Sequence, residues 1–191
     1  MARLNRESVV AAALALLDEV GIDSITTRRL AQRLGVEQPA LYWHFRNKAE
    51  LLAAMADAAM EPHATAPLPS SSDEWQVWFA DNMRSFRRTL LLRRDGARLH
   101  AGSRPRDVDA DRIAKKVAFL VVSGIKEEDA RMAMLAAGRF TVGSVLEEQA
   151  DILSHGDVEH ISNGIPIDQG AAFEAGLCLI VDGLAKRFEQ N

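Results

Sequence analysis

A glycine between two short helix-forming segments is the feature of this sequence that most restricts its fold. Residues 27–34, TRRLAQRL, have their apolar side chains at helical spacing, and Gly35 follows directly. Thr26 can cap the start of this helix, and Gly35 can end it in the left-handed conformation that a glycine adopts without strain. Pro39 then fits the first turn of another helix, where its missing N–H is not needed. With an amphipathic segment ahead of them, these elements predict a three-helix unit that contains a helix-turn-helix.

The remainder of the chain is expected to be helical as well. Asn5 can cap a first helix that Gly21 ends. Asn47 can cap a fourth helix, with Glu50 as its capping-box partner. Because apolar residues recur at helical spacing in the later segments 75–90, 127–153 and 171–188, we predict an all-α protein.

The charge is divided unevenly along the chain. Overall, 23 Lys and Arg against 27 Asp and Glu give a net charge of −4. Residues 1–48, however, contain seven basic and five acidic residues, a balance of +2, and the remainder has a balance of −6. A basic head on an acidic body is expected where only the head contacts phosphates. We therefore predict a DNA-binding domain at 1–47 and a helical core at 48–191.

The short third helix carries side chains suited to reading DNA. Gln38 suits bidentate pairing with adenine, and Arg28, in the second helix, has the guanidinium fork that guanine accepts. Tyr42 can reach a phosphate or a thymine methyl group. A further group would hold the DNA backbone and fix the register: Trp43, His44 and Lys48. The alternative is that Tyr42 and Trp43 are core aromatics of a three-helix cluster.

Two later helices each combine an apolar face with one polar side chain. Over 75–90 the face holds one amide, Asn82, among Trp75, Trp78, Phe79, Met83, Phe86 and Leu90. Over 127–153, Glu147 ends a line formed by Ala136, Phe140 and Gly143. An unpaired buried polar group costs about 1–3 kcal/mol, and a buried carboxylate needs a cation, a metal or several donors. The two faces therefore predict a mostly apolar pocket for a small molecule, with a few polar contacts.

The same segments resemble a known family. The stretch TTRRLAQRLGVEQPALYWHFRNKAELL is similar to the DNA-binding head of the TetR family, and within it of the tetracycline repressors. WQVWFADNMRSFRRTLLLRRDGARLHAGSRP and AAGRFTVGSVLEEQ resemble their ligand-binding core, so the likeness extends over nearly the whole chain. It implies a homodimeric repressor that binds palindromic operator DNA without a cofactor and is released by a magnesium–tetracycline chelate. The alternative inducer is another polycyclic or apolar molecule that binds without metal.

The resemblance also implies roles for individual residues. In the core, His100 would ligate Mg²⁺ and Glu147 would hold metal-bound water. Asn82 would bond the polar edge of the drug, and Phe86 and Pro105 would pack against its rings. The other ligand contacts implied are Ser103, Arg104, Lys116 and Met134. In the head, the resemblance adds Thr27, Pro39 and Ala40 to the DNA contacts.

Several positions depart from the tetracycline repressor pattern. Ala64 stands where those repressors use a drug-binding histidine, and Lys116 replaces a glutamine. Arg131 replaces an apolar contact, so both cations are expected to bring positive charge near a site for a cationic chelate. Ala40 replaces a threonine, which predicts a slightly different operator. The chain is also short between 153 and 169, where the family's pocket-covering helix is expected to be missing or reduced.

The helices at 127–149 and 171–188 are expected to be covered on several sides, because apolar and small residues surround them. One face of the second contains Phe173, Leu177, Ile180, Val181, Leu184 and Phe188. The resemblance implies that both helices pair with their copies in a homodimer. The residues alone allow an intrachain bundle equally well.

The remaining features exclude other classes. The sequence has no apolar run of about 20 residues, and its N-terminus lacks a signal-peptide core, so we expect a cytoplasmic protein with no membrane contact. Cys178 is the only cysteine and is expected to be a buried free thiol. No phosphate loop, G-x-S-x-G elbow or dinucleotide glycine motif is present, which disfavours an enzyme with a helical core.

Overall fold

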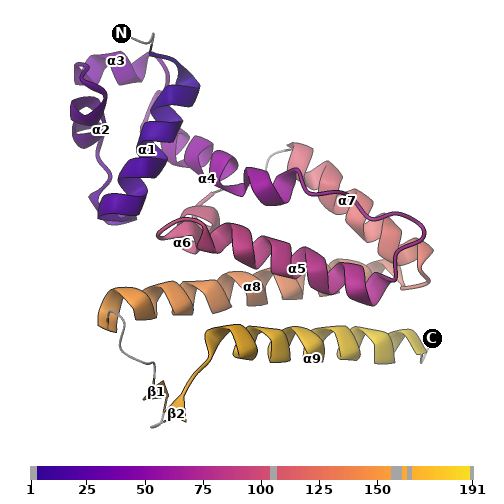
Figure 1. Cartoon of the computed structure of the whole chain (residues 1–191). Helices are drawn as coiled ribbons and strands as arrows, with labels where there is room; N and C mark the ends of the chain where they lie inside the picture. The colour runs from indigo at the N-terminus through magenta and orange to yellow at the C-terminus, as the bar shows by residue number, and fades with distance from the viewer. Residues whose placement is uncertain (1–3, 104–106, 156–160, 163–164, 190–191) are drawn as a thin grey trace. The chain divides into compact units, whose positions relative to one another are not determined.

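The computed structural model describes residues 4–103, 107–155, 161–162 and 165–189. These residues form helices and one short antiparallel ladder, so the predicted all-α class is confirmed (Figure 1). The elements are α1 (Arg6–Val20), the 3₁₀ turn η1 (Ile22–Ser24), α2 (Thr27–Leu34), α3 (Gln38–Tyr42), α4 (Lys48–Ala64), α5 (Trp75–Leu91), α6 (Gly96–Ala101), α7 (Asp107–Val122), α8 (Glu127–His155), β1 (Ile161–Ser162), β2 (Ile165–Pro166) and α9 (Gln169–Glu189). Between α8 and α9 the described residues contain the ladder and no further helix.

The chain packs as two compact units. The first, called the head unit here, comprises 1–63 and 89–104, and the second, the core unit, comprises 64–88 and 105–191. The head unit extends past residue 47 because α4 contributes Leu51 and Met55 to its apolar core. The functional boundary at 47 stays a prediction.

The helix caps of the head unit are as the sequence predicts. The Asn5 side chain accepts a hydrogen bond from the Ser8 amide at 2.7 Å, and the Ser8 hydroxyl accepts one from the Asn5 amide. Gly35 has φ 65° and ends α2 in the left-handed conformation. Asn47 accepts from the Glu50 amide at 2.9 Å, which confirms the predicted cap of α4. The Glu50 carboxylate, however, binds the Arg46 amide in place of the expected Asn47 amide.

The short helix α6 packs in the head unit, although it lies about 75 residues after the η1 turn that it contacts. Leu99 is 2% exposed within the head's apolar core. Asp95 is buried at a left-handed φ of 56°, and its carboxylate accepts from the Ile22 amide at 2.8 Å. Arg98 binds both carboxylate oxygens of Asp23 at 2.9 Å. The turn η1 is therefore held by α6 and its N-cap, a contact that helical periodicity does not predict.

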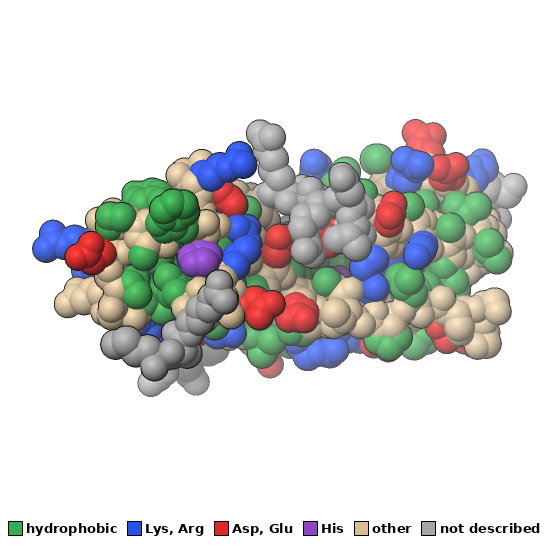
Figure 2. Space-filling view, turned by 90° about the horizontal axis from the view of Figure 1, so that it is seen from above, with side chains coloured by type: hydrophobic (Ala, Val, Ile, Leu, Met, Phe, Trp, Pro, Cys, Tyr) green, Lys and Arg blue, Asp and Glu red, His purple; other side chains and the backbone are tan. Residues whose placement is uncertain are grey.

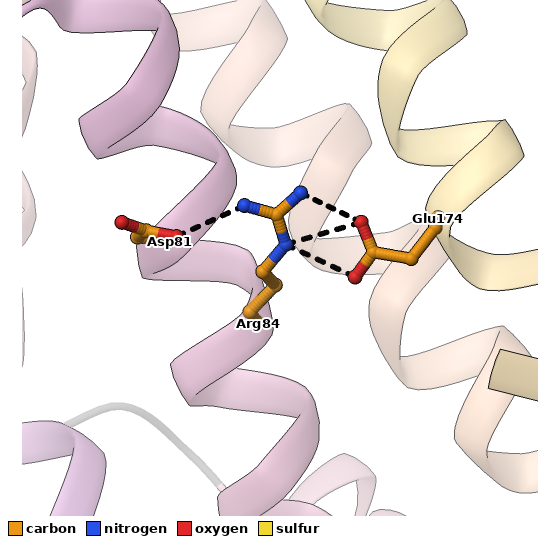
Figure 3. Close-up of polar contacts among 3 residues, drawn as sticks. All are labelled: Asp81, Arg84 and Glu174. Carbon is orange, nitrogen blue, oxygen red and sulfur yellow. Dashed lines mark hydrogen bonds and ion pairs between the residues drawn. The ribbon is translucent and has the colours of Figure 1, made fainter. Parts of the chain in front are cut away.

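Helix α5 presents the predicted apolar face to the interior of the core unit. Trp75, Phe79 and Met83 are buried there with residues of α7 and α9. On another side of α5, Arg84 joins it to α9, because its guanidinium binds Asp81 at 2.9 Å and Glu174 at 2.7 Å (Figure 3). The hydrogen bonds that Arg84 donates to Glu174 and Asp81 raise the pKa of Arg84, and the Arg84 guanidinium lowers the pKa of Glu174.

The predicted inner face of α8 is wrong. Ala136 and Glu147 are exposed, and the buried line runs through Ala137, Thr141 and Val145. Helix α8 has small or apolar residues on most sides, so its periodicity gives no direction and the predicted face lies one residue away from the buried one. A carboxylate does enter the interior of this unit, but it belongs to the next residue along the chain, Glu148.

Helix α9 runs beside α8 in the opposite direction (Figure 1). Phe173, Leu177 and Leu184 are buried as predicted, whereas the side chain of Phe188 lies outside the described residues. Cys178 is exposed, so the expectation of a buried thiol is wrong. It lies next to the apolar stripe of α9 and not within it. Among the helices described here, none is long and apolar enough to span a bilayer.

Candidate DNA-binding head and ligand core

The residues predicted to contact DNA lie on α2, on α3 and at the start of α4. The two aromatic side chains are exposed, Tyr42 by 51% and Trp43 by 89%. Such exposure argues against the alternative that these rings belong to the head's core. Arg28 and Lys48 are exposed as well, and His44 is half-buried. In Figure 2 the end with the histidine shows hydrophobic side chains at the surface, together with basic and acidic side chains.

The start of α3 is tied to the start of α2. The Gln38 amide donates a hydrogen bond to the Thr27 hydroxyl at 2.8 Å. This contact fixes the direction of Gln38, whose amide is the group predicted to pair with adenine. Pro39 occupies the first turn of α3, is exposed, and Ala40 beside it is half-buried.

Arg6 is a residue of the head that the sequence did not single out. Its guanidinium donates to the His44 carbonyl at 2.7 Å and to the Glu50 carboxylate at 3.0 Å. It also lies 4.3 Å from the ring centroid of Phe45, which is buried. Since His44 and Phe45 follow α3 directly, Arg6 holds the end of the recognition helix against α1. Only tertiary structure reveals this role, because the partners are 38 or more residues apart.

Two substitutions in the head should have different effects on DNA binding. Arg28→Ala is expected to cost about 1–3 kcal/mol and to relax discrimination at one base position, because a bidentate contact with guanine is lost. Lys48→Ala should weaken binding to every sequence alike. It should also lower the slope of log binding constant against log salt concentration by about one, because one phosphate contact is lost. Titrations of specific and random duplexes at several salt concentrations measure both effects. Equal losses on both duplexes for Arg28→Ala would remove its base-reading role.

The residues predicted to bind the ligand are divided between the two units. Asn82 and Phe86 on α5, Lys116 on α7 and Met134 on α8 belong to the core unit; Phe86 and Lys116 are buried, and the other two are half-buried. Glu147 belongs to the core unit too but lies on its exposed side. His100 and Ser103 are half-buried residues of the head unit. Arg104 and Pro105 lie outside the described residues.

The interior of the core unit contains an ion pair that the sequence reading missed. Arg87 on α5 binds Glu148 on α8 at 2.6 Å, and their side chains are 16% and 19% exposed. The Arg87 guanidinium also lies 5.1 Å from the ring centroid of Phe173 on α9. Its Nε is buried without a hydrogen-bond partner, so the Glu148 carboxylate is the anion to which this guanidinium is hydrogen-bonded, through a terminal nitrogen. The pair links three helices around the apolar core.

Comparison with known proteins identifies the family. Residues 9–55 match the bacterial regulatory proteins of the tetR family, and residues 67–165 match the tetracyclin repressor-like C-terminal domain. The tetracycline repressor protein class A from transposon 1721 of Escherichia coli is 45% identical over 98% of this chain and 93% of its own length. The chain belongs to the TetR family.

Two solved structures show the same TetR fold. The TetR-family regulator SCO0253 from Streptomyces coelicolor has 61% identity and a TM-score of 0.75, with 96% of this chain and 99% of that chain covered. TetR class A in complex with 5a,6-anhydrotetracycline and magnesium has 45% identity and a TM-score of 0.81, with 96% and 99% covered. TetR-family regulators bind operator DNA and ligands and function as dimers. This chain is thus a ligand-responsive transcriptional repressor close to the tetracycline repressors, and its relatives are regulators and not enzymes.

Among the positions where this TetR-family chain departs from the tetracycline repressor pattern, Lys116 changes the charge of the interior. Burial, and next the charge of Arg112, lowers the pKa of the Lys116 ammonium from 10.5 to about 8. Arg131, the other added cation, is 65% exposed and binds Glu127 at 2.7 Å. Its charge is therefore balanced at the surface, contrary to the expectation that it adds charge to the pocket. Of the two substitutions, Lys116 alone places a cation in the interior.

The lowered pKa predicts that Lys116 destabilises the repressor at neutral pH. The pKa of Lys116 is lower in the folded chain than in the unfolded chain, so the unfolded chain binds the proton more tightly. Below pH 8 this difference lowers the free energy of unfolding by about 3 kcal/mol. Lys116→Met should therefore raise the free energy of unfolding at pH 7 by up to about 3 kcal/mol. The difference between the two proteins should shrink as pH rises from about 8 toward 10.5. Urea unfolding of both proteins across this range tests it, and a pH-independent difference would contradict it.

Proposed function

We propose that this protein is a cytoplasmic homodimer that represses transcription at a palindromic operator and leaves the DNA when a polycyclic molecule binds its core unit. The observation that carries the proposal is the exposed surface of α2 and α3, where Tyr42, Trp43 and Arg28 face solvent on a well-packed head. Large aromatic side chains exposed beside basic ones are expected where the partner is DNA.

The dimer is supported by apolar side chains on α8 and α9. Met132, Leu135 and Ile152 on α8 are 45–61% exposed, and Leu179 on α9 is 74% exposed. Large apolar side chains left exposed on two adjacent helices are expected where another protein covers those helices. A second copy is the partner that matches the family, and a two-fold dimer would present two α3 helices to successive major grooves.

The first inducer to test is the magnesium–tetracycline chelate. In the described residues no three His, Cys, Asp or Glu side chains cluster as a metal site. Of the two ligands that the resemblance implies, His100 would bind Mg²⁺ directly and Glu147 through water, so the drug and water would have to supply the remaining oxygen ligands, which this ion prefers. When bound, the ion would add positive charge that orients the drug's oxygens. His100 would hold it through a ring nitrogen, Glu147 through water, and Asn82 would bond the drug itself.

A second inducer class is favoured by one observation. Lys116, a cation buried in the core unit, opposes a cationic chelate. A polycyclic molecule that binds without metal would avoid this repulsion. Both classes require the same apolar surroundings, to which Phe86 and Met134 contribute.

Selection from a pool of random DNA duplexes tests the proposed function. The purified repressor should enrich a palindrome whose half-sites lie about one helical turn, 34–36 Å, apart. The enriched duplex is then the operator for release experiments with each inducer class. Enrichment of a single, non-palindromic half-site would contradict the proposal that a homodimer binds the operator.

A further inference from the structure

One guanidinium and one carboxylate enclose the turn between α3 and α4. The Arg6 guanidinium donates to the His44 carbonyl at 2.7 Å and to one Glu50 carboxylate oxygen at 3.0 Å. The other Glu50 oxygen accepts from the Arg46 amide at 2.9 Å. Both ends of this chain of hydrogen bonds are main-chain groups of the turn. The backbone from residue 44 to residue 46 is therefore held by two side chains from outside the turn, one on α1 and one on α4.

Both side chains start from positions that are themselves fixed. Arg6 is the first residue of α1, and the Asn5 cap sets where that helix begins. The Arg6 guanidinium lies 4.3 Å from the ring centroid of Phe45, a buried residue of the head's apolar core. Glu50 lies in the first turn of α4, behind the Asn47 cap. The two groups can therefore impose a position on the turn between them.

The enclosed turn joins residues predicted to hold the DNA backbone. Trp43 and His44 lie at its beginning, and Lys48 follows it as the first residue of α4. The Lys48 side chain is exposed. Contacts with phosphates fix how a protein sits on the duplex, so each cation has to lie at the right place relative to α3. A displaced turn would move Lys48 away from that place.

The charge of Glu50 is the opposite of the charge that DNA attracts. The hydrogen bond from the Arg46 amide, and next the one from Arg6, lowers the pKa of Glu50, so this side chain is an anion at neutral pH. An anion in a DNA-binding head repels phosphates. Its ion pair with Arg6 adds little stability, because the two side chains are 50% and 35% exposed and water screens them. Neither effect favours an acidic residue here, whereas the geometry of the turn does.

We infer that Arg6 and Glu50 are positioning residues for DNA binding, which hold the turn at 44–46 so that Lys48 reaches a phosphate while α3 lies in the major groove. This role rests on the proposed operator binding and adds to it two residues that act through the turn. Loss of the Glu50 carboxylate should then weaken DNA binding, although it removes a charge that repels phosphates. Long-range electrostatics alone gives the opposite sign.

Titration of the selected operator and of a random duplex with Glu50→Ala tests this role. Both duplexes should be bound about 5- to 20-fold more weakly than by wild type, as for the loss of one phosphate contact. The slope of log binding constant against log salt concentration should fall by about one. Glu50→Gln, which keeps one acceptor oxygen, should lose less affinity but still bind more weakly than wild type.

Glu19→Ala is the matched control. It removes another carboxylate of the head unit, which pairs with Arg33 at 2.6 Å and not with the turn. This variant should bind both duplexes at least as tightly as wild type, with an unchanged salt slope. Arg6→Met should weaken binding as Glu50→Ala does. The double variant should lose about as much affinity as Arg6→Met alone, because both side chains act through the same turn.

Circular dichroism at the temperature of the titrations establishes that each variant is folded. Binding by Glu50→Ala or Glu50→Gln that equals or exceeds that of wild type would overturn the positioning role. So would a loss of affinity with an unchanged salt slope, which a smaller folded fraction produces, or an equal loss in Glu19→Ala. If wild type binds no palindrome, the proposed function fails; if wild type binds one and Glu50→Ala binds it equally well, the positioning role fails alone.

Discussion

Leu179→Glu should convert the repressor to a monomer and lower its operator affinity by about 10²- to 10⁴-fold. Leu179 is 74% exposed on α9, so the substitution leaves the apolar core of its own chain intact. Two glutamates facing each other across the two-fold axis would have to be buried without partners, which costs more than the dimer gains. One head alone contacts one half-site, and the avidity of two linked heads is lost. Sedimentation and DNA titration on the same samples measure both effects.

The matched control is Val122→Glu. Val122 is 81% exposed at the end of α7 and does not belong to α8 or α9, so this variant should remain a dimer with unchanged operator affinity. Leu177 is unsuitable for the test because it is 1% exposed, and a charge there would disrupt the core. A Leu179→Glu protein that sediments as a dimer and binds the operator normally would show that α9 is not the interface.

Glu148→Ala should destabilise the core unit by about 2–4 kcal/mol, with a fall in Tm of about 5–15 °C. The substitution leaves the Arg87 guanidinium largely buried and without its anion, while its Nε already lacks a partner. Removing one member of a buried pair costs more than the pair itself contributes, because the remaining charge is uncompensated. Thermal unfolding followed by circular dichroism gives the value.

Glu127→Ala is the control for this experiment. Glu127 and Arg131 form an ion pair of similar length, 2.7 Å, but both side chains are about two-thirds exposed. Water screens such a pair, so its loss should change stability by no more than about 1 kcal/mol. The double variant Arg87→Met, Glu148→Leu should recover most of the stability lost in Glu148→Ala. Similar effects for Glu148→Ala and Glu127→Ala would show that burial of the first pair has no energetic consequence.

Local signals in the sequence were sufficient to predict the helix ends of the head. Asn5, Thr26, Gly35 and Asn47 each specify a helix end through their own side chain or backbone freedom, and each lies where it was expected. The clear apolar face of α5 was predicted for the same reason, because its polar and apolar residues alternate at a single period. Exposure of Trp43 beside buried Leu41 likewise follows from the pattern of α3.

The features that sequence reasoning missed depend on which surface another helix covers. Helix α8 has apolar residues nearly all round, so its spacing could not decide between Glu147 and Glu148 as the interior carboxylate. Cys178 was predicted to be buried because its neighbours are apolar, but part of α9 is left open in the single chain. The packing of α6 in the head unit joins residues about 75 positions apart, and no local signal specifies it.

Release of labelled operator DNA by ligand tests the central claim most directly. Fluorescence anisotropy would follow the wild-type complex during titration with tetracycline, in the presence of Mg²⁺ or of EDTA, and with a polycyclic aromatic compound that does not chelate metal. We expect at least one of these ligands to release the DNA. Tetracycline should do so only when Mg²⁺ is present, and only at high concentration, because the Lys116 cation opposes the cationic chelate. Asn82→Ala should bind the operator as wild type does but resist release, since its amide is proposed to bond the ligand and lies on α5, outside the helices predicted to contact DNA. A complex that stays intact at saturating concentrations of every ligand, or one released equally well after Asn82→Ala, would contradict the account.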